Sequence, residues 1–387
     1  MRIYMPNTTI AYLILGIFIV AVSNECLRAQ ETVSPNPLPL SPPIKTISSS
    51  FMRSKSLTPP LYDHQHFIQF KHHSISSEDQ IVYLFDSSGQ SENTLTIWPK
   101  GISGLFLTSV DVGAGQQLVY AGTTMRSEGG NANFIAVSDL RNKNPIYFNT
   151  GSYLATQIAQ AEDGSVWAVG AEHSEAVDAS SAKWKNYGVL RHYDVHGKLL
   201  EELLPRWEDN VAYVTGAKTP GIEAAYDIQG NPTTTGRRDA IWGYQDAWRG
   251  SRQVYLRSVG SQTILYDGVR NLLCKHDSAA RTFSCGSIAG TNTQTFSRTT
   301  GFALLSDGNV VASFRSPGSE ADSLTGLFLL TPRTSASQFE WTEVPGTKGT
   351  LQTEGGFLSI LGVDHTALIY RRIQSEYSQP LIYESSW

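Results

Sequence analysis

Short apolar runs separated by turn residues dominate the chain from Leu61 onward. Runs rich in Val, Ile, Tyr, Phe and Thr recur between turns of Gly, Asp and Asn. No stretch of twelve or more residues keeps the i, i+3, i+4 apolar spacing of an amphipathic helix. The pattern therefore predicts an all-β body over residues 61–387.

The predicted strands come in groups of four. From Tyr153 to Pro205 the runs LATQIAQ, SVWAVG, YGVLRHYD and KLLEELLP are separated by the turn AEDG, a polar loop and the turn VHG. The same order recurs from Leu105 and from Gly301, and a further copy begins near residue 356. We therefore expect four-stranded antiparallel meanders along the body.

The spacing of these groups favours a β-propeller. The copies that start near residues 105, 155, 301 and 356 lie 50, 146 and 55 residues apart, and 146 residues accommodate three units of about 49. Repetition at this period is typical of propeller blades and favours a propeller over a sandwich. Counting the strands at the two ends separately gives seven blades, and merging them gives six. We expect the strands at Phe67 and Leu381 to meet where the ring closes.

The first 60 residues differ from this body. The apolar run IAYLILGIFIVAV has 13 residues, whereas a membrane-spanning helix needs about 20. Together with Arg2 it predicts a signal peptide over residues 1–29, cleaved after Ser23 or after Ala29. The Pro- and Ser-rich residues 30–60 that follow predict a linker. We expect a periplasmic or extracellular protein without a membrane span after cleavage.

Charge and composition exclude two classes of protein. The chain has 30 Lys and Arg residues against 35 Asp and Glu residues, a net charge of −5, and so lacks the basic surface that nucleic acid requires. Apolar residues make up 40% of the chain, which excludes a disordered protein.

Two of the repeated units carry turn signatures that resemble the NHL and virginiamycin-B-lyase type of secreted propeller. The signatures are DGSVWAVG at Asp163–Gly170, followed by LRHYDVHGKLLEEL, and SDGNVVASF at Ser306–Phe314. Gly164, Gly197 and Gly308 supply the positive φ that tight hairpins require. The resemblance covers two blades and implies a propeller fold, but it assigns no catalytic or metal-binding residue to this chain.

Cleavage after Ala29 would leave two cysteines, Cys274 and Cys285. The intervening KHDSAARTFS has a polar centre, which predicts a hairpin with the cysteines opposite each other. In an oxidising compartment they would form a disulfide bond, and the alternative is two buried thiols. A zinc site is disfavoured, because there is no C-x-x-C spacing and only His276 lies nearby.

Four histidines, His64, His66, His72 and His73, cluster near the start of the body. His64 and His66 lie two residues apart, so on a strand both would face one side, as in some zinc and copper sites. No third ligand follows at a fixed spacing. We therefore interpret them as solvated histidines and expect no metal and no cofactor.

The segment from Trp242 to Tyr255 is the strongest candidate for a ligand patch. It combines aromatic and basic side chains, namely Trp242, Tyr244, Trp248, Arg249 and Arg252. Aromatic faces beside guanidinium groups can stack on a saccharide or a peptide. Blades also use Trp and Tyr for packing, which is the structural alternative.

Signals for nucleophilic catalysis are absent from the sequence. The single stretch that approaches G-x-S-x-G, at residues 286–290, has Ile288 at its centre. His192, Tyr193 and Asp194 alternate faces along one strand, so they cannot form a triad, and we expect His192 to be a satisfied strand histidine. Scattered candidates for a channel enzyme are Glu223, Asp239, Asp246, His276 and Asp307.

The sequence thus predicts an exported β-propeller that acts as a non-enzymatic binding or interaction module for a protein, peptide or saccharide ligand. One alternative is a lyase- or lactonase-type propeller enzyme, which needs a metal or a set of His and Glu side chains converging on the central channel. Another alternative is a structural repeat at the cell surface.

Overall fold

Fourteen segments of the chain are described by the computed structural model. They are residues 45–47, 57–58, 60–113, 115–173, 184–203, 254–267, 272–277, 282–289, 298–315, 325–332, 338–347, 357–364, 367–373 and 381–386. Every regular element in these segments is a β-strand, and they contain no helix that could span a membrane. The predicted signal peptide lies outside them.

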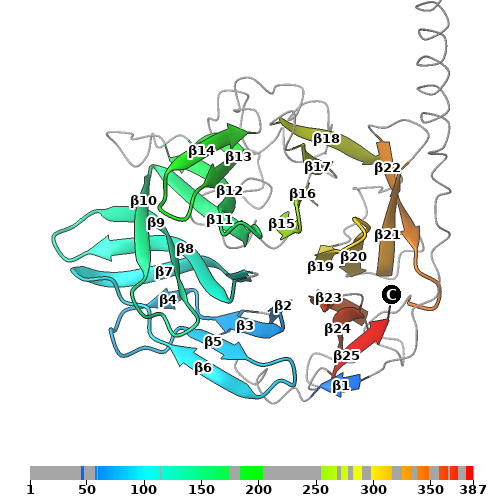
Figure 1. Ribbon diagram of the computed structural model, residues 1–387, viewed down its shortest axis with the longest axis horizontal. Coiled ribbons are helices and arrows are strands. Elements are labelled where there is room, and N and C mark those ends of the chain that lie inside the picture. Colours follow the sequence, from blue (N-terminus) through cyan, green and yellow to red (C-terminus); the bar gives the residue numbers. More distant parts are fainter. Residues whose placement is uncertain are drawn as a thin grey trace, which may run out of the picture. The chain divides into compact units, whose positions relative to one another are not determined.

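Six small antiparallel sheets are arranged as the blades of a six-bladed β-propeller (Figure 1). From the inner strand outward, blade 1 contains β2 (Leu61–Asp63), β3 (His66–Phe70), β5 (Val82–Phe85) and β6 (Ser91–Leu95). Blade 2 contains β7 (Ile102–Gly113), β8 (Gln117–Arg126), β9 (Asn131–Asp139) and β10 (Ile146–Gly151), with β4 (His73–Ser74) beside β7. Blade 3 contains β11 (Tyr153–Gln160), β12 (Val166–His173), β13 (Trp184–Tyr193) and β14 (Leu199–Leu203).

The remaining blades follow the same order. Blade 4 contains β15 (Val254–Val259), β16 (Gln262–Asp267), β17 (Leu272–Asp277) and β18 (Thr282–Ala289). Blade 5 contains β19 (Arg298–Leu304), β20 (Val310–Arg315), β21 (Gly326–Pro332) and β22 (Gln338–Glu343). Blade 6 contains β23 (Phe357–Asp364), β24 (Ala367–Ile373), β25 (Leu381–Ser386) and, outermost, β1 (Lys45–Ile47).

The all-β propeller predicted from the sequence is confirmed, with the lower of the two blade counts. The spacing argument was wrong in one interval, because the described strands between Tyr153 and Arg298 form two blades, 3 and 4, rather than three. The predicted strand DAIWGY lies in residues 204–253, which are outside the described part of the chain.

An N-terminal strand completes blade 6. Lys45–Ile47 pairs antiparallel with β25, with Thr46 opposite Tyr383. The sequence predicted that the strands at Phe67 and Leu381 would meet where the ring closes, and they do so by packing, because Phe67 of β3 and Ile382 of β25 are buried in one apolar core between blades 1 and 6. The backbone of β3 pairs within blade 1. The outermost strand of blade 6, β1, falls within the range predicted as a linker, and its pairing joins residues from opposite ends of the chain in one blade.

The outer strands of blades 4 and 5 also pair with each other. Ser287–Ala289 of β18 runs parallel to Gln338–Glu340 of β22, so the two blades form one eight-stranded sheet. All other strand pairs in the described residues are antiparallel.

Four inner strands share a β-bulge near their middle. The register shifts between Leu107 and Ser109 in β7, and equivalent shifts occur in β11, β19 and β23. In three of them the extra residue is a threonine, namely Thr108, Thr156 and Thr300. The Thr108 hydroxyl donates to the carbonyl oxygen of Ala155, 2.6 Å away in the next blade. Such bulges leave backbone groups unpaired, and the hydroxyls replace part of the lost pairing.

Apolar cores fill the spaces between neighbouring blades. One core packs β23 and β24 of blade 6 against β20 and β21 of blade 5, with Val311, Leu329, Ile360 and Leu368 buried in it. Blade 6 approaches blade 1 closely at Gly362, where a Cβ atom would overlap with the carbonyl oxygen of Tyr62. The inner strands thereby come together around the axis of the ring.

Candidate functional site

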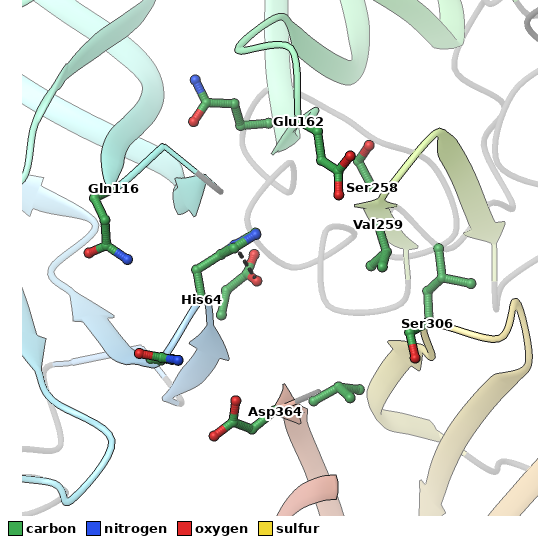
Figure 2. Close-up of a pocket in the computed structure, with 13 residues that line it drawn as sticks. His64, Gln116, Glu162, Ser258, Val259, Ser306 and Asp364 are labelled. Atoms are coloured by element: carbon green, nitrogen blue, oxygen red, sulfur yellow. Dashed lines mark ion pairs between the residues drawn. The ribbon is translucent and has the colours of Figure 1, made fainter. Parts of the chain in front are cut away.

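A cavity of about 360 Å³ lies where the inner strands of the six blades turn into their second strands (Figure 2). Each blade contributes at least one lining residue. The lining is Asp63, His64 and Gln65 of blade 1, Gln116 of blade 2, Gln160 and Glu162 of blade 3, Ser258, Val259 and Gly260 of blade 4, Leu304 and Ser306 of blade 5, and Val363 and Asp364 of blade 6. The cavity therefore lies on the propeller axis and depends on the closed ring.

Tight turns position these side chains. In blade 1 the strands pair Asp63 with His66, so His64 and Gln65 form a two-residue turn with φ values of 43° and 68°. Positive φ at both central residues is the type I′ geometry that joins twisted antiparallel strands. The turn directs His64 into the cavity, at a point where most proteins place Asn or Gly.

His64 is held by two acceptors. Its Nδ1 lies 2.8 Å from the carbonyl oxygen of Val112 and 2.8 Å from Asp63 Oδ1, so Nδ1 carries a proton and donates it. The hydrogen bond to Asp63, opposed by burial, raises the pKa of His64 to about 9. The imidazole is therefore positively charged at neutral pH, and in the described residues its Nε2 has no hydrogen-bonding partner.

A second carboxyl group, Asp111 of β7, stands behind Asp63. Asp111 is 5% exposed, is hydrogen-bonded to Asp63 and accepts the backbone N–H of Gln160 at 3.2 Å. Burial, reinforced by the charge of Asp63, raises the pKa of Asp111 well above its ordinary value.

The pKa of Asp63 is shifted in the opposite direction to that of Asp111. Burial opposes its ionisation, but the hydrogen bond from His64 and the positive charge of His64 outweigh burial and lower the pKa of Asp63. Of the two carboxyl groups, Asp111 therefore holds the proton and Asp63 carries the negative charge. A carboxylic acid beside a carboxylate is an arrangement that can both donate and accept a proton.

Two further carboxylates line the cavity from opposite walls. Glu162 lies in the turn after β11 of blade 3, and Asp364 ends β23 of blade 6 (Figure 2). Tyr62 donates its hydroxyl hydrogen bond to Asp364, and burial together with that carboxylate raises the pKa of Tyr62. The hydrogen bond from Tyr62 fixes the position of the Asp364 carboxyl group.

Gln160 completes the wall beside Glu162. It is 3% exposed, and its Nε2 donates to Gln117 Oε1 at 2.7 Å and to the carbonyl oxygen of Gly164 at 3.1 Å. Both Nε2 contacts are to oxygen atoms, which fixes the orientation of the amide. Its Oε1 is buried and has no hydrogen-bonding partner in the described residues.

The structure corrects the sequence interpretation of the histidine cluster. His64 and His66 do not share a strand face, because a turn separates them, and His66 is buried beside Glu92, with its Nε2 2.9 Å from Glu92 Oε2. His72 contacts Phe106 and the carbonyl oxygen of Leu107. Within the described segments, no three His, Cys, Asp or Glu side chains converge as a metal site would require.

His192 lies in a contact between blades 3 and 4. Its ring stacks on Trp167 with centroids 3.9 Å apart, and its Nε2 lies 2.7 Å from Ser165 Oγ. Ser165 donates its hydroxyl to Asp163, so it accepts from His192 and is not activated as a nucleophile. The ring of His276 in blade 4 also contacts Trp167, with centroids 4.6 Å apart. His192 therefore has both a stacking and a hydrogen-bonding partner, which agrees with the satisfied strand histidine expected from the sequence.

The other candidates are distributed as follows. The patch of Trp242, Tyr244, Trp248, Arg249 and Arg252 lies outside the described residues, as do Glu223, Asp239 and Asp246. Tyr255, at the end of that segment, packs against Tyr266 and Phe302 between blades 4 and 5. Asp307 is exposed in a turn, where it accepts the backbone N–H of Asn309.

The predicted cysteine hairpin is present. Strands β17 and β18 are antiparallel neighbours, and Cys274 lies directly opposite Cys285 in their register. Directly opposite residues have Cα atoms about 4.5–5.5 Å apart, a separation within the range that disulfide bonds span.

Sequence reasoning missed every residue around the cavity except His64, which it assigned to a solvated strand. A usable signal was present, because each lining residue lies at or just after the end of an inner strand. Aligning the ends of the repeated inner strands would have placed Asp63 and Asp364 at the last strand residue, and Glu162 and Gln116 two and three residues after it.

No protein-family model matches the chain, and no curated protein matches its sequence. Among solved structures, a luciferin-regenerating enzyme is similar over 91% of this chain and 96% of its own, with a TM-score of 0.41 and 8% identity. A Bacteroides fragilis protein named as an exported protein is similar over 92% of this chain and 97% of its own, with a TM-score of 0.40 and 10% identity. A GH74 xyloglucanase from Xanthomonas campestris is similar over 85% of this chain and 44% of its own, with a TM-score of 0.43 and 15% identity.

Proposed function

We propose that this propeller is a binding module and that its ligand is a small polar molecule held in the axial cavity. The observation that carries the proposal is that all six blades direct turn residues into one cavity of about 360 Å³. That volume lies within the range of small-molecule sites. Its wall offers carboxylate, amide, hydroxyl and imidazole groups beside the apolar side chains of Leu304, Val259 and Val363.

A blocking substitution tests the proposal. Ser306 is exposed and lines the cavity, so Ser306→Trp should fill part of the space without disturbing a core. Ser127→Trp is the matched control, because Ser127 is exposed in the turn between β8 and β9. Ligand-observed NMR against a panel of small sugars, amino acids, amines and dicarboxylates should show binding to the natural protein and to Ser127→Trp, but not to Ser306→Trp. Binding that survives Ser306→Trp would place the ligand elsewhere.

A channel enzyme is the second candidate, and Asp63, Asp111 and His64 favour it. Together they provide a carboxylate and a charged imidazole at one wall of the cavity, with a protonated carboxyl group buried behind them. General acid and base catalysis uses groups of this kind. The same NMR spectra separate the candidates, because an enzyme would convert a bound compound over time and Asp63→Asn would stop the conversion. Binding without conversion favours the binding module.

We further propose that the protein is exported and that Cys274 and Cys285 form a disulfide bond. The apolar run in residues 10–22 supports export, and the register of β17 and β18 supports the bond. Mass spectrometry of protein recovered outside the cytoplasm should find an N-terminus at Asn24 or Gln30 and no alkylatable thiol at either of these two cysteines. An intact N-terminus and two alkylated cysteines would contradict both parts.

Two predictions from the sequence remain proposals. The turn signatures at Asp163 and Asp307 support a repeat of the NHL type. The aromatic and basic residues from Trp242 to Arg252 support a second contact surface, for a saccharide or a peptide.

A further inference from the structure

The cavity wall that contains His64 carries more positive than negative charge. His64 pairs with Asp63 at 2.8 Å, and the positive charge of Arg257 in blade 4 acts on both Asp63 and Asp111. Because burial raises the pKa of Asp111, that carboxyl group is neutral, and Asp63 is the single anion among these four side chains. Two cations therefore stand beside one anion, so this wall attracts a negatively charged ligand group.

His64 presents a donor of this positive charge to the cavity. Its Nδ1 faces Asp63 and the carbonyl oxygen of Val112, each 2.8 Å away, which leaves Nε2 without a hydrogen-bonding partner among the described residues. The side chain is 30% exposed, and its ring points into the cavity (Figure 2). A protonated imidazole donates from both nitrogen atoms, and a carboxylate is the acceptor that forms the stronger, charge-assisted hydrogen bond.

Glu162 of blade 3 provides the opposite charge on a different wall. It is exposed, lines the cavity and makes no ion pair with any residue that the structure describes. Its carboxylate leans toward the turn of blade 4, with Oε1 3.9 Å from the position that a Cβ atom of Gly260 would take (Figure 2). The other acidic side chain on the far wall, Asp364, is already engaged, because Tyr62 donates a hydrogen bond to it. Glu162 is therefore the carboxylate that can bind a positive ligand group.

We propose that the cavity selects a linear ω-amino acid, whose carboxylate accepts the Nε2 proton of His64 and whose ammonium group pairs with Glu162. This inference rests on the proposed function, since it assigns a ligand class to the same cavity. The two protein groups belong to blades 1 and 3, so the two ligand charges must be separated by a chain. Apolar side chains that also line the cavity can contact its methylene groups, namely Val259, Leu304 and Val363.

A zwitterion suits these charges better than a ligand with one charge. A ligand that carries only a positive charge would be repelled by His64 and Arg257. A ligand that carries only a negative charge would be repelled by Glu162. An amino acid has no net charge and satisfies both walls.

Calorimetric titration of the full chain with four compounds of similar length tests the assignment. The probe 4-aminobutyrate carries both charges, n-butylamine only the positive charge, butyrate only the negative charge, and n-butanol neither. We expect 4-aminobutyrate to bind at least about tenfold more tightly than n-butylamine or butyrate, because each of these lacks one charge-assisted contact. We expect no binding of n-butanol.

Two variants locate the two ends of the ligand by opposite patterns. Glu162→Gln should weaken 4-aminobutyrate binding by at least about tenfold and leave butyrate binding unchanged, because it removes only the partner of the ammonium group. His64→Asn should weaken 4-aminobutyrate binding to a similar extent and leave n-butylamine binding unchanged. A variant that merely disturbed the fold would weaken all the compounds.

The variants have structural controls. Glu128→Gln is matched to Glu162→Gln, since Glu128 is exposed in the turn between β8 and β9, and it should leave binding unchanged. Glu162 is exposed, so its variant should fold. Asn tolerates the positive φ of 43° at position 64, and circular dichroism checks the fold of His64→Asn.

The outcomes separate the ligand class from the cavity itself. Binding of n-butylamine or butyrate as tightly as 4-aminobutyrate, or 4-aminobutyrate binding that either variant retains in full, overturns the amino-acid assignment. No binding of 4-aminobutyrate overturns it as well, and a different compound whose binding Ser306→Trp abolishes would then keep the cavity as the ligand site. Binding of 4-aminobutyrate that Ser306→Trp leaves unchanged overturns both the assignment and the cavity.

Discussion

At the scale of single residues, the wall of the cavity is organised by one proton donor and two carboxyl groups. The Nδ1 of His64 faces Asp63 and the carbonyl oxygen of Val112, and Asp111 lies behind them, almost fully buried. Removing one of these three side chains would leave the charge of another without its partner. An unpaired charge in a buried position destabilises the folded state. We therefore expect these residues to affect stability as well as binding.

The stability of the protein should depend on the charge of His64. Its pKa is raised to about 9 in the folded chain, from an ordinary value near 6.5, so folding favours the protonated ring. The stabilisation is complete below about pH 6.5 and is lost as the pH rises through about 9. Since the side chain is 30% exposed, solvent screening limits the loss to about 1–2 kcal/mol.

Chemical denaturation at pH 6, 7.5 and 9.5 measures this dependence. His64→Asn is the suitable variant, because Asn tolerates the positive φ of 43° at this position and does not titrate. The natural protein should lose stability relative to His64→Asn across this range. Asp63 and Asp111 are electrostatically coupled to His64, so the difference between the two proteins reports the titration of the three groups together. If the free energy of unfolding of the two proteins changed equally with pH, the positive charge assigned to His64 would be wrong.

At the scale of elements, the short strand β1 has an influence beyond its length. Only Lys45–Ile47 forms it, yet it is the strand through which the N-terminal part of the chain completes blade 6. Closed repeat folds depend on such contacts, because a single blade cannot bury both of its faces alone.

Two truncations that differ by one short strand test the role of β1. A chain that begins at Ile44 keeps the strand, whereas a chain that begins at Ser48 lacks it. At about 1 kcal/mol per lost backbone hydrogen bond and an unfolding entropy of about 2.1 cal/mol/K per residue, the shorter chain should melt about 2–5 °C below the longer one. Scanning calorimetry compares them directly. Equal melting temperatures would show that the ring does not need β1.

The elements also show where sequence reasoning succeeded. The turns at Gly164, Gly197 and Gly308 were predicted from Asp-Gly and His-Gly pairs, and each glycine has a φ between 83° and 85°. The residues within such a turn determine its conformation, so a single sequence is sufficient to predict it. By contrast, Lys45–Ile47 lies in a Pro- and Ser-rich stretch without apolar periodicity, and only its distant partner β25 makes it a strand.

At the scale of the whole molecule, the fold could be predicted because the strand order repeats from blade to blade. The cavity could not be predicted, because its lining residues do not repeat. The blades share strand order and even a bulged threonine, at Thr108 and Thr156, 48 residues apart. The lining residues differ in type from blade to blade, so no motif marks them. Their proximity arises only when residues as distant as His64 and Asp364 meet around the closed ring.

The parallel pairing of β18 with β22 has a consequence for the behaviour of the protein at high concentration. An unpaired outer strand offers its backbone to other chains and so promotes aggregation. In blades 4 and 5 these edges cover each other along Ser287–Ala289 and Gln338–Glu340. The outer strands β10 and β14 have no such cover within the described sheets and expose Ile146, Tyr147, Leu199 and Leu200. Self-association of the folded protein should therefore begin at blades 2 and 3, and charged residues placed on these two strands would oppose it.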